Sequence, residues 1–149
     1  MKFPERILLD GAEKPEIVHQ HLARYEFAGR FVRGKRVLDV ACGSGYGAAI
    51  LREAGAAYVL GVDKSESAVE YAKNHNSRDS VEFVFGTSEN LSPYGEFDVV
   101  VSFETIEHLT YPETFLAQVT RLLSPGGNLI ISTPARQHGS LADKPQNPF

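Results

Sequence analysis

The sequence predicts an α/β domain built on a doubly wound, mainly parallel sheet of about five strands. Three observations support this. Short apolar segments alternate with segments of helical periodicity, at a spacing typical of parallel sheets with right-handed crossovers. Several apolar runs are continuous, which indicates strands buried on both faces. One apolar run leads directly into a glycine-rich turn. The length of 149 residues suits a single domain over residues 1–149.

The elements follow in order along the chain. Helices are expected over 15–34, 46–55, 65–76 and 112–124, and strands over 35–41, 56–63, 81–86, 97–103 and 128–134. Pro15 suits a first helical turn, Ser65 can cap a helix, and Gly34 and Gly55 are typical helix stops. The first helix should bury Val18, Leu22, Val32 and either Tyr25 or Phe27. Residues 1–14 and 135–149 lack periodicity and are expected to be irregular.

Composition limits the classes of function. The chain is 42% hydrophobic and 23% charged, and its net charge of -4 argues against a broad nucleic-acid-binding surface. A basic cluster (Arg30, Arg33, Lys35 and Arg36) is more simply interpreted as a solvated helix end. Cys42 is the single cysteine, so no intrachain disulfide forms. The charged N-terminus is unlike a signal peptide, and no apolar run approaches the ~20 residues of a membrane helix. We therefore expect a cytoplasmic protein with no nucleic-acid or membrane partner.

The glycine turn, "VLDVACGSGYGA", predicts a ligand site. Gly43 and Gly45 bracket Ser44, and glycines permit positive φ and close approach of a ligand. The helix that follows offers free N–H groups to an anionic ligand group. The spacing of Gly43, Gly45 and Ala48 also satisfies the dinucleotide fingerprint, so the turn alone leaves the ligand open.

Two aspartates narrow the choice. Asp39 lies inside an apolar strand, where it would repel a pyrophosphate and favour a ligand with an amino group. S-adenosylmethionine has an α-amino group, a carboxylate and a sulfonium, and no phosphate. The alternative is that Asp39 bonds the backbone of its own turn. Asp63 ends the second strand, where an acid can accept hydrogen bonds from ribose hydroxyls. NAD enzymes use an acid at the same place, so Asp63 indicates a ribose without identifying the cofactor. Its alternative role is to complement the dipole of the next helix.

The turn resembles the first motif of class I S-adenosylmethionine-dependent methyltransferases, an acid-x-Gly-x-Gly-x-Gly pattern in which Ala41 replaces the first glycine. The resemblance implies a Rossmann-like sheet, S-adenosylmethionine as cofactor and S-adenosylhomocysteine as product. It places Ala41, Gly43 and Gly45 against the methionine part of the cofactor. Cys42 and Lys64 are also counted among the cofactor-binding residues.

Two further segments carry the resemblance. "FGTSENL" is similar to the adenine segment of the family, which places Ser88 at the adenine edge, with Thr87 where an Asp is frequent. "FDVVVSFETIEHL" is similar to the fourth strand and its loop, which places Phe103 and Glu104 beside the transferred methyl. "STP" after the fifth strand also matches.

The first helix extends the resemblance. "HLARYEFA" followed by "GKRVLDVACGSGYG" is similar to a bacterial subset found near polysaccharide-assembly genes, which suggests a glycan acceptor. In the family this helix often covers the cofactor, so Tyr25 is expected over the methionine moiety. The alternative is that Tyr25 packs in the core against Phe27 and Phe31.

Glu104, Glu107 and His108 form an E-x-x-E-H pattern. On a helical turn these side chains share one face, and a similar arrangement holds a metal in some O-methyltransferases. A second interpretation makes His108 the general base, since imidazole titrates near neutral pH. In the third, Glu107 and His108 only shape the loop. We predict no metal and take His108 as the catalytic candidate.

The expected function is transfer of a methyl group from S-adenosylmethionine to a small-molecule or glycan acceptor. Two rivals are a non-catalytic S-adenosylmethionine-binding or scaffold module and an NAD-binding protein, which Asp39 disfavours. The family sheet usually has a C-terminal hairpin after the fifth strand, and about fifteen residues here leave no room for it. We therefore expect a C-terminally truncated domain whose fifth strand is an exposed edge, which a homodimer would cover.

Overall fold

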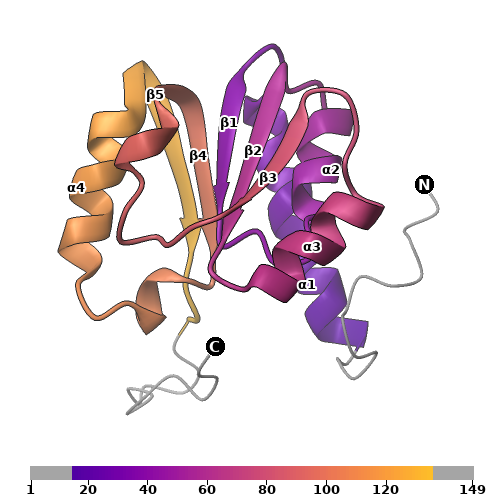
Figure 1. Ribbon diagram of the computed structural model, residues 1–149, viewed down its shortest axis with the longest axis horizontal. Helices are drawn as coiled ribbons and strands as arrows, with labels where there is room; N and C mark the ends of the chain where they lie inside the picture. The colour runs from indigo at the N-terminus through magenta and orange to yellow at the C-terminus, as the bar shows by residue number, and fades with distance from the viewer. Residues whose placement is uncertain (1–14, 136–149) are drawn as a thin grey trace.

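A computed structural model describes residues 15–135; of the irregular ends expected over 1–14 and 135–149, all but residue 135 lie outside this range. Its centre is a five-stranded, all-parallel sheet in the order β3-β2-β1-β4-β5 (Figure 1). The strands are β1 (Arg36–Val40), β2 (Tyr58–Asp63), β3 (Val81–Phe85), β4 (Phe97–Phe103) and β5 (Leu123–Ser132). The predicted doubly wound α/β class is confirmed.

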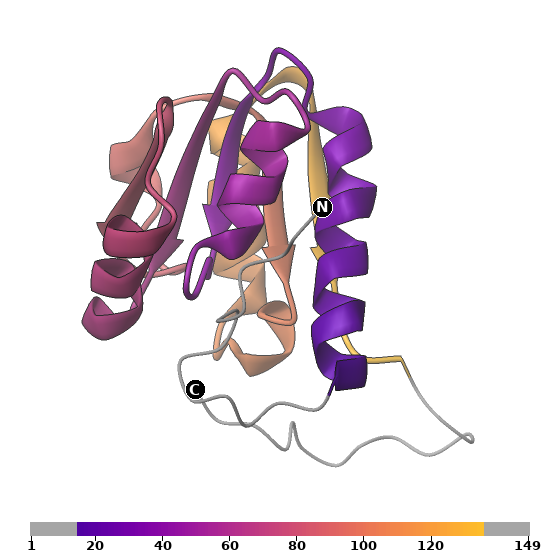
Figure 2. The same cartoon turned by 90° about the vertical axis from the view of Figure 1, so that its right-hand side faces the viewer.

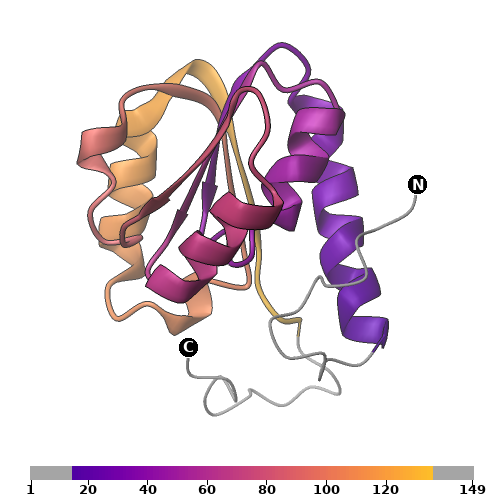
Figure 3. The ribbon, with the colours of Figure 1, turned by 45° about the vertical axis from the view of Figure 1, so that its right-hand side comes forward.

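Helices cover both faces of this sheet. One face carries α1 (Pro15–Ala28), α2 (Tyr46–Glu53) and α3 (Glu66–His75), and the other carries α4 (Pro112–Leu122), as Figures 1 and 3 show. Three short 3-10 turns complete the described elements: η1 (Gly29–Phe31), η2 (Ser92–Tyr94) and η3 (Ile106–His108). No helix among the described residues has both the length and the apolar character needed to cross a membrane.

The core has two parts because strand side chains alternate between faces. Val37, Val99 and Val101 pack toward α1, α2 and α3, whereas Leu38 and Val100 pack toward α4. All five side chains are fully buried. The near-continuous apolar runs of the inner strands therefore result from burial on both faces.

Two predicted boundaries differ from the structure by more than two residues. The first helix ends at Ala28 rather than continuing to residue 34, and the chain tightens into η1 at Gly29. A Cβ on Gly29 would lie 3.0 Å from the Cβ of Ala54, so close packing against the end of α2 sets this boundary. The fifth strand begins at Leu123, which pairs with Phe97 directly after α4. Residues 125–127, which the predicted ranges leave between helix and strand, instead lie within β5, where its pairing with β4 shifts register.

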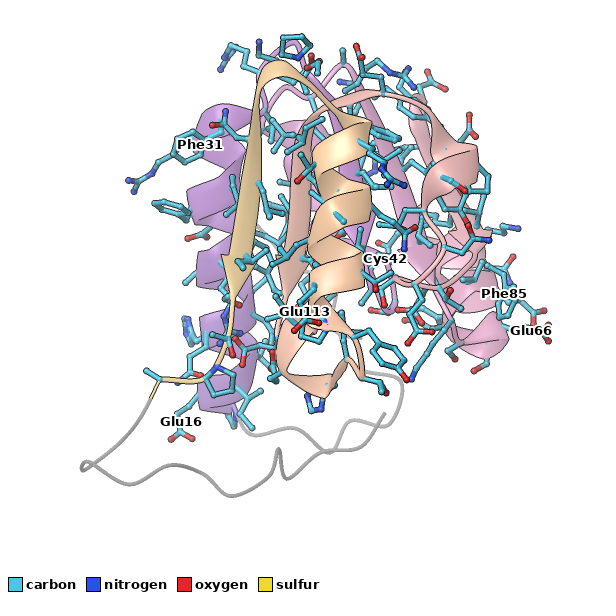
Figure 4. The ribbon with its side chains drawn as sticks, turned by 90° about the vertical axis from the view of Figure 1, so that its left-hand side faces the viewer. Glu16, Phe31, Cys42, Glu66, Phe85 and Glu113 are labelled. Carbon is cyan, nitrogen blue, oxygen red and sulfur yellow. The ribbon has the colours of Figure 1, made fainter. Side chains whose placement is uncertain are left out.

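The carboxyl ends of the five strands meet at one edge of the sheet, called here the carboxyl edge; the opposite edge is the amino edge. The strand order reverses between β1 and β4, the place where ligands bind in open α/β sheets. Figure 2 shows α1 running alongside the sheet. Figure 4 places Glu16 at the carboxyl-edge end of α1 and Phe31 toward the amino edge.

Candidate functional site

The glycine turn after β1 has a left-handed backbone at every second residue: Ala41 (φ 63°), Gly43 (φ 54°) and Gly45 (φ 82°). At Gly45 a Cβ would lie 2.6 Å from the Phe83 ring and 2.8 Å from the Cβ of Ala72, so this glycine is required by packing. A Cβ added to Gly43 would meet no atom within 4 Å. The turn is therefore fixed from below at Gly45 and open at Gly43, where a ligand can approach the backbone.

Asp63 at the end of β2 is tied to this turn. Its Oδ2 accepts the N–H of Gly43 at 2.8 Å, and its Oδ1 accepts the N–H of Ser65 at 2.9 Å. A carboxylate offers about four lone-pair positions, so two remain for hydroxyl donors. Both predicted functions of Asp63 are thus compatible with one geometry: it stabilises the start of α3 and faces the open side of the turn.

Asp39 of β1 is buried and paired with Tyr25 of α1. The Tyr25 hydroxyl lies 3.2 Å from both carboxylate oxygens, and Asp39 and Tyr25 are 1% and 5% exposed. The Tyr25 ring packs edge-on against Phe103 (centroids 4.9 Å apart) and Tyr46 (5.6 Å). Tyr25 lies in the core, as the alternative interpretation predicted, but its predicted partners are wrong: the Phe27 and Phe31 rings pack on each other at 5.4 Å and are exposed.

This pair has unusual protonation. Burial raises the pKa of Asp39 to about 7; the hydrogen bond from Tyr25 partly offsets the increase, and the nearby charge of Asp63 adds to it. Burial, and then the charge of Asp39, raise the pKa of Tyr25 well above its ordinary value. Tyr25 therefore remains a hydrogen-bond donor, while Asp39 changes charge near neutral pH.

Gly47, which sequence reasoning did not select, makes room for Tyr25. A Cβ on Gly47 would lie between 2.0 and 2.5 Å from atoms of the Tyr25 ring. The only local signal is that Gly47 continues the glycine run into the first turn of α2. Its function becomes visible once α1 is placed over that turn.

Glu104 connects three elements at the carboxyl edge. It has a left-handed backbone (φ 51°), and its N–H donates to the carbonyl of Ser132 at 3.0 Å. Its Oε1 accepts the Ser132 hydroxyl at 2.8 Å and pairs with the Arg24 guanidinium of α1 at 3.3 Å. Ser132 belongs to the "STP" segment noted in the sequence, but its partnership with Glu104, like that of Arg24, joins residues far apart in the chain and had no sequence signal.

Glu107 and His108 lie together on η3, with Glu107 Oε1 3.7 Å from His108 Nε2 and both side chains largely buried. Both carboxylate oxygens of Glu107 are buried without a hydrogen-bond partner. The convergence of Glu104 with these two is not observed, since Glu104 turns toward Arg24 and Ser132. Within residues 15–135, no three His, Cys, Asp or Glu side chains are placed to hold a metal ion.

The remaining candidates lie around the same edge. Thr87 is exposed and Ser88 half-buried in the loop after β3, where Gln118 of α4 binds the backbone of Glu89 and Leu91. Lys64 is exposed beside Asp63, and Phe85 marks the outer margin at β3 (Figure 4). The Cys42 side chain is 3% exposed within the core, and burial raises the pKa of its thiol, so only its backbone belongs to the turn.

A parallel sheet with a glycine turn after β1 and an acid after β2 defines a class of nucleoside-binding α/β proteins. The methyltransferase domain family matches residues 38–131, and the chain belongs to this family. The predicted class I S-adenosylmethionine-dependent methyltransferase family, its fold and its cofactor class are therefore confirmed.

Individual relatives agree. A probable S-adenosylmethionine-dependent methyltransferase of Mycolicibacterium smegmatis is 35% identical over 147 residues, which cover 97% of this chain and 56% of that protein. The mitochondrial ubiquinone biosynthesis O-methyltransferase of Schizosaccharomyces pombe is 37% identical over 108 residues, covering 69% of this chain and 39% of that protein. This chain thus spans about half the length of the curated relatives it matches.

Solved structures show the same fold. An S-adenosylmethionine-dependent methyltransferase from Mesorhizobium loti has a TM-score of 0.67 at 29% identity, covering 74% of this chain and 53% of that one. The complex of DhpI with S-adenosylhomocysteine has a TM-score of 0.69 at 27% identity, covering 80% of this chain and 59% of that one.

Proposed function

We propose that this chain binds S-adenosylmethionine at the carboxyl edge and transfers its methyl group to a small-molecule or glycan acceptor. The observation that carries the proposal is the open backbone at Gly43, with the Asp63 carboxylate 2.8 Å from the Gly43 nitrogen. The arrangement offers a ligand an uncovered stretch of main chain and an acceptor for ribose hydroxyls on adjoining elements.

The same geometry disfavours a dinucleotide. A pyrophosphate needs free N–H groups at the glycine turn, but the Gly43 N–H already donates to Asp63. Asp63 would also repel a phosphate placed there. A cofactor with ribose hydroxyls and an amino group, and no phosphate, meets neither obstacle.

Each candidate residue then has a proposed task. Asp63 accepts from the ribose, with Lys64 beside it, and Thr87 and Ser88 flank the adenine. The turn from Ala41 through Cys42 and Gly43 to Gly45 provides the backbone beside the methionine part. Phe103 and Tyr25 border that part, and Asp39 acts through Tyr25, because its carboxylate is enclosed beneath that ring.

The cofactor, when bound, supplies an electrophilic methyl group on a sulfonium. The chain must align the acceptor with that methyl group and exclude water. We assign to His108 the removal of a proton from an acceptor hydroxyl. An oxygen acceptor is supported by the ubiquinone-pathway relatives, which are named O-methyltransferases. With an acceptor found by screening, His108→Gln should lower turnover and leave the affinity for S-adenosylhomocysteine unchanged; equal turnover would remove this role.

The decisive experiment is a calorimetric titration with S-adenosylmethionine, S-adenosylhomocysteine and NAD on a matched pair of variants. Gly43→Ala and Gly34→Ala place a Cβ at positive φ (54° and 71°), and neither Cβ meets an atom within 4 Å. Both should cost about 1 kcal/mol of stability. Only Gly43→Ala should abolish binding of the first two ligands, because Gly34 lies at the amino edge. Binding of NAD alone, or equal binding by both variants, would overturn the proposal.

The scaffold alternative rests on β5. Among the described residues β5 pairs with β4 alone, so the backbone on the side of β5 away from β4 is available for association. Ile131 of this strand is 40% exposed. We propose that a homodimer covers this edge. Light scattering should give twice the mass of the chain, and a monomer at high concentration would exclude it.

A further inference from the structure

Asn76, at the end of α3, is hydrogen-bonded to the glycine turn. Its side-chain Nδ2 donates to the backbone carbonyl of Ser44 at 2.8 Å, across 32 residues of sequence. Asn76 and Ser44 are each 7% exposed. The buried side-chain amide of Asn76 therefore joins the end of α3 to the backbone of the glycine turn.

The face of α3 supports the turn at two points. Ala72 and Asn76 are four residues apart and therefore lie on one side of the helix. Ala72 packs against Gly45: a Cβ added to Gly45 would lie only 2.8 Å from the Cβ of Ala72. Asn76 binds the carbonyl of Ser44, the residue before Gly45. The α3 backbone is capped independently, by the Ser65 hydroxyl at its start and by the Asn76 N–H to the Ala72 carbonyl at its end.

The Ser44–Gly45 peptide is held on both sides as a result. Its carbonyl accepts from Asn76, and its N–H donates to the Cys42 carbonyl at 3.0 Å. Because Gly45, on one side of this peptide plane, permits either sign of φ, the glycine alone does not select one orientation. Losing the Asn76 donor would remove a hydrogen bond from this buried carbonyl and would favour rotation of the peptide.

We propose that Asn76 is a positioning residue for the cofactor: it fixes the orientation of the Ser44–Gly45 peptide and thereby keeps the open face of Gly43 in its binding conformation. This inference rests on the proposed function, because the ligand held by the turn is S-adenosylmethionine. The residue acts only through the turn and does not itself contact the cofactor.

The test compares Asn76→Asp with Asn76→Ala by calorimetric titration with S-adenosylhomocysteine. An ionised Asp has the shape of Asn but has no donor, and it would repel the Ser44 carbonyl. If the donor matters, both variants weaken binding by about tenfold or more, and Asp weakens it at least as much as Ala. If Asn76 merely fills space, Asp binds nearly as well as the unaltered chain and only Ala is impaired.

A control and a second measurement separate the outcomes. Asp98→Asn replaces one of the two carboxylate oxygens that accept the Arg36 N–H and the Ser124 hydroxyl at the amino edge, so it tests whether general destabilisation alone weakens binding. Amide exchange of Gly45 without ligand should accelerate in both Asn76 variants, because the peptide is released. Unchanged affinity in Asn76→Asp overturns the role of Asn76 alone, whereas no binding by the unaltered chain overturns the proposed function.

Discussion

The pKa of a buried or partly buried aspartate is shifted in opposite directions at the two edges of the sheet. At the amino edge, Asp98 accepts the Arg36 N–H at 2.9 Å and the Ser124 hydroxyl at 3.1 Å, and these hydrogen bonds lower its pKa. The Arg36 guanidinium also stacks over the rings of Tyr58 and Phe97. At the carboxyl edge, Asp39 is buried with one phenolic donor, and its pKa rises to about 7.

The carboxyl edge has further features that disfavour stability. Glu107 has two buried carboxylate oxygens without a hydrogen-bond partner, and Ala41 and Glu104 have left-handed backbones. Such features persist where surrounding packing enforces them, and they concentrate at functional sites. The amino edge is thus organised for stability and the carboxyl edge for a ligand. The predictions below test this division, beginning with the largest effect.

Replacing Asp39 should change the pH dependence of stability. A carboxyl whose pKa is about 3.8 unfolded and about 7 folded binds more protons in the folded state, so its contribution to stability falls as pH rises between these values. The loss is about 4 kcal/mol at about 1.4 kcal/mol per pKa unit. Asp39→Asn keeps an acceptor for Tyr25 and cannot ionise. Its stability relative to the unaltered chain, measured by urea unfolding, should therefore rise from about pH 4 to about pH 7 and then level off.

Asp98→Asn is the matched control at the amino edge. The pKa of Asp98 is lowered, so its stabilising contribution is present above the unfolded pKa and is lost only as pH falls through the folded pKa. The difference curve for Asp98→Asn should therefore be flat over the range where that for Asp39→Asn changes. Two flat curves would show that the edges do not differ in this respect.

Gly47→Ala should be the next most disruptive change. The added Cβ would overlap the Tyr25 ring, so α1 or the start of α2 must shift, at a cost of about 3 kcal/mol. Gly126→Ala at the amino edge introduces a Cβ at φ 78° that meets nothing within 4 Å, and it should cost only about 1 kcal/mol. Chemical denaturation followed by tyrosine fluorescence measures both. Equal losses would mean that Tyr25 is not held where the structure places it.

Much of the fold could be predicted because its signals are local. The β4 run "FDVVVSF" matches the predicted strand at both ends, and Ser65 caps α3 as expected. The site was predicted less completely. Helical periodicity could not decide whether Tyr25 or Phe27 faces inward, since both fit the spacing. The partnerships of Asn76 with Ser44 and of Arg24 with Glu104 span long separations, and a left-handed Glu104 has no sequence signature.

The smallest expected effect comes from relieving left-handed backbone strain at Ala41, beside the proposed ligand site, or at Ser80, far from it. Ala41 (φ 63°) lies in the glycine turn, and Ser80 (φ 65°) precedes β3 at the amino edge. Replacing either residue with glycine removes about 1–2 kcal/mol of strain from the left-handed backbone. It also lowers stability by about 0.4–1 kcal/mol, because glycine raises the conformational entropy of the unfolded chain. Both variants should therefore gain about 0.5–1 kcal/mol by thermal unfolding. Only Ala41→Gly should also tighten S-adenosylhomocysteine binding a few-fold, because a glycine in the turn permits closer approach of the ligand to the backbone. If Ser80→Gly changed the affinity equally, the two edges would be coupled, and the ligand would depend on the stability of the whole sheet rather than on the local geometry of one turn.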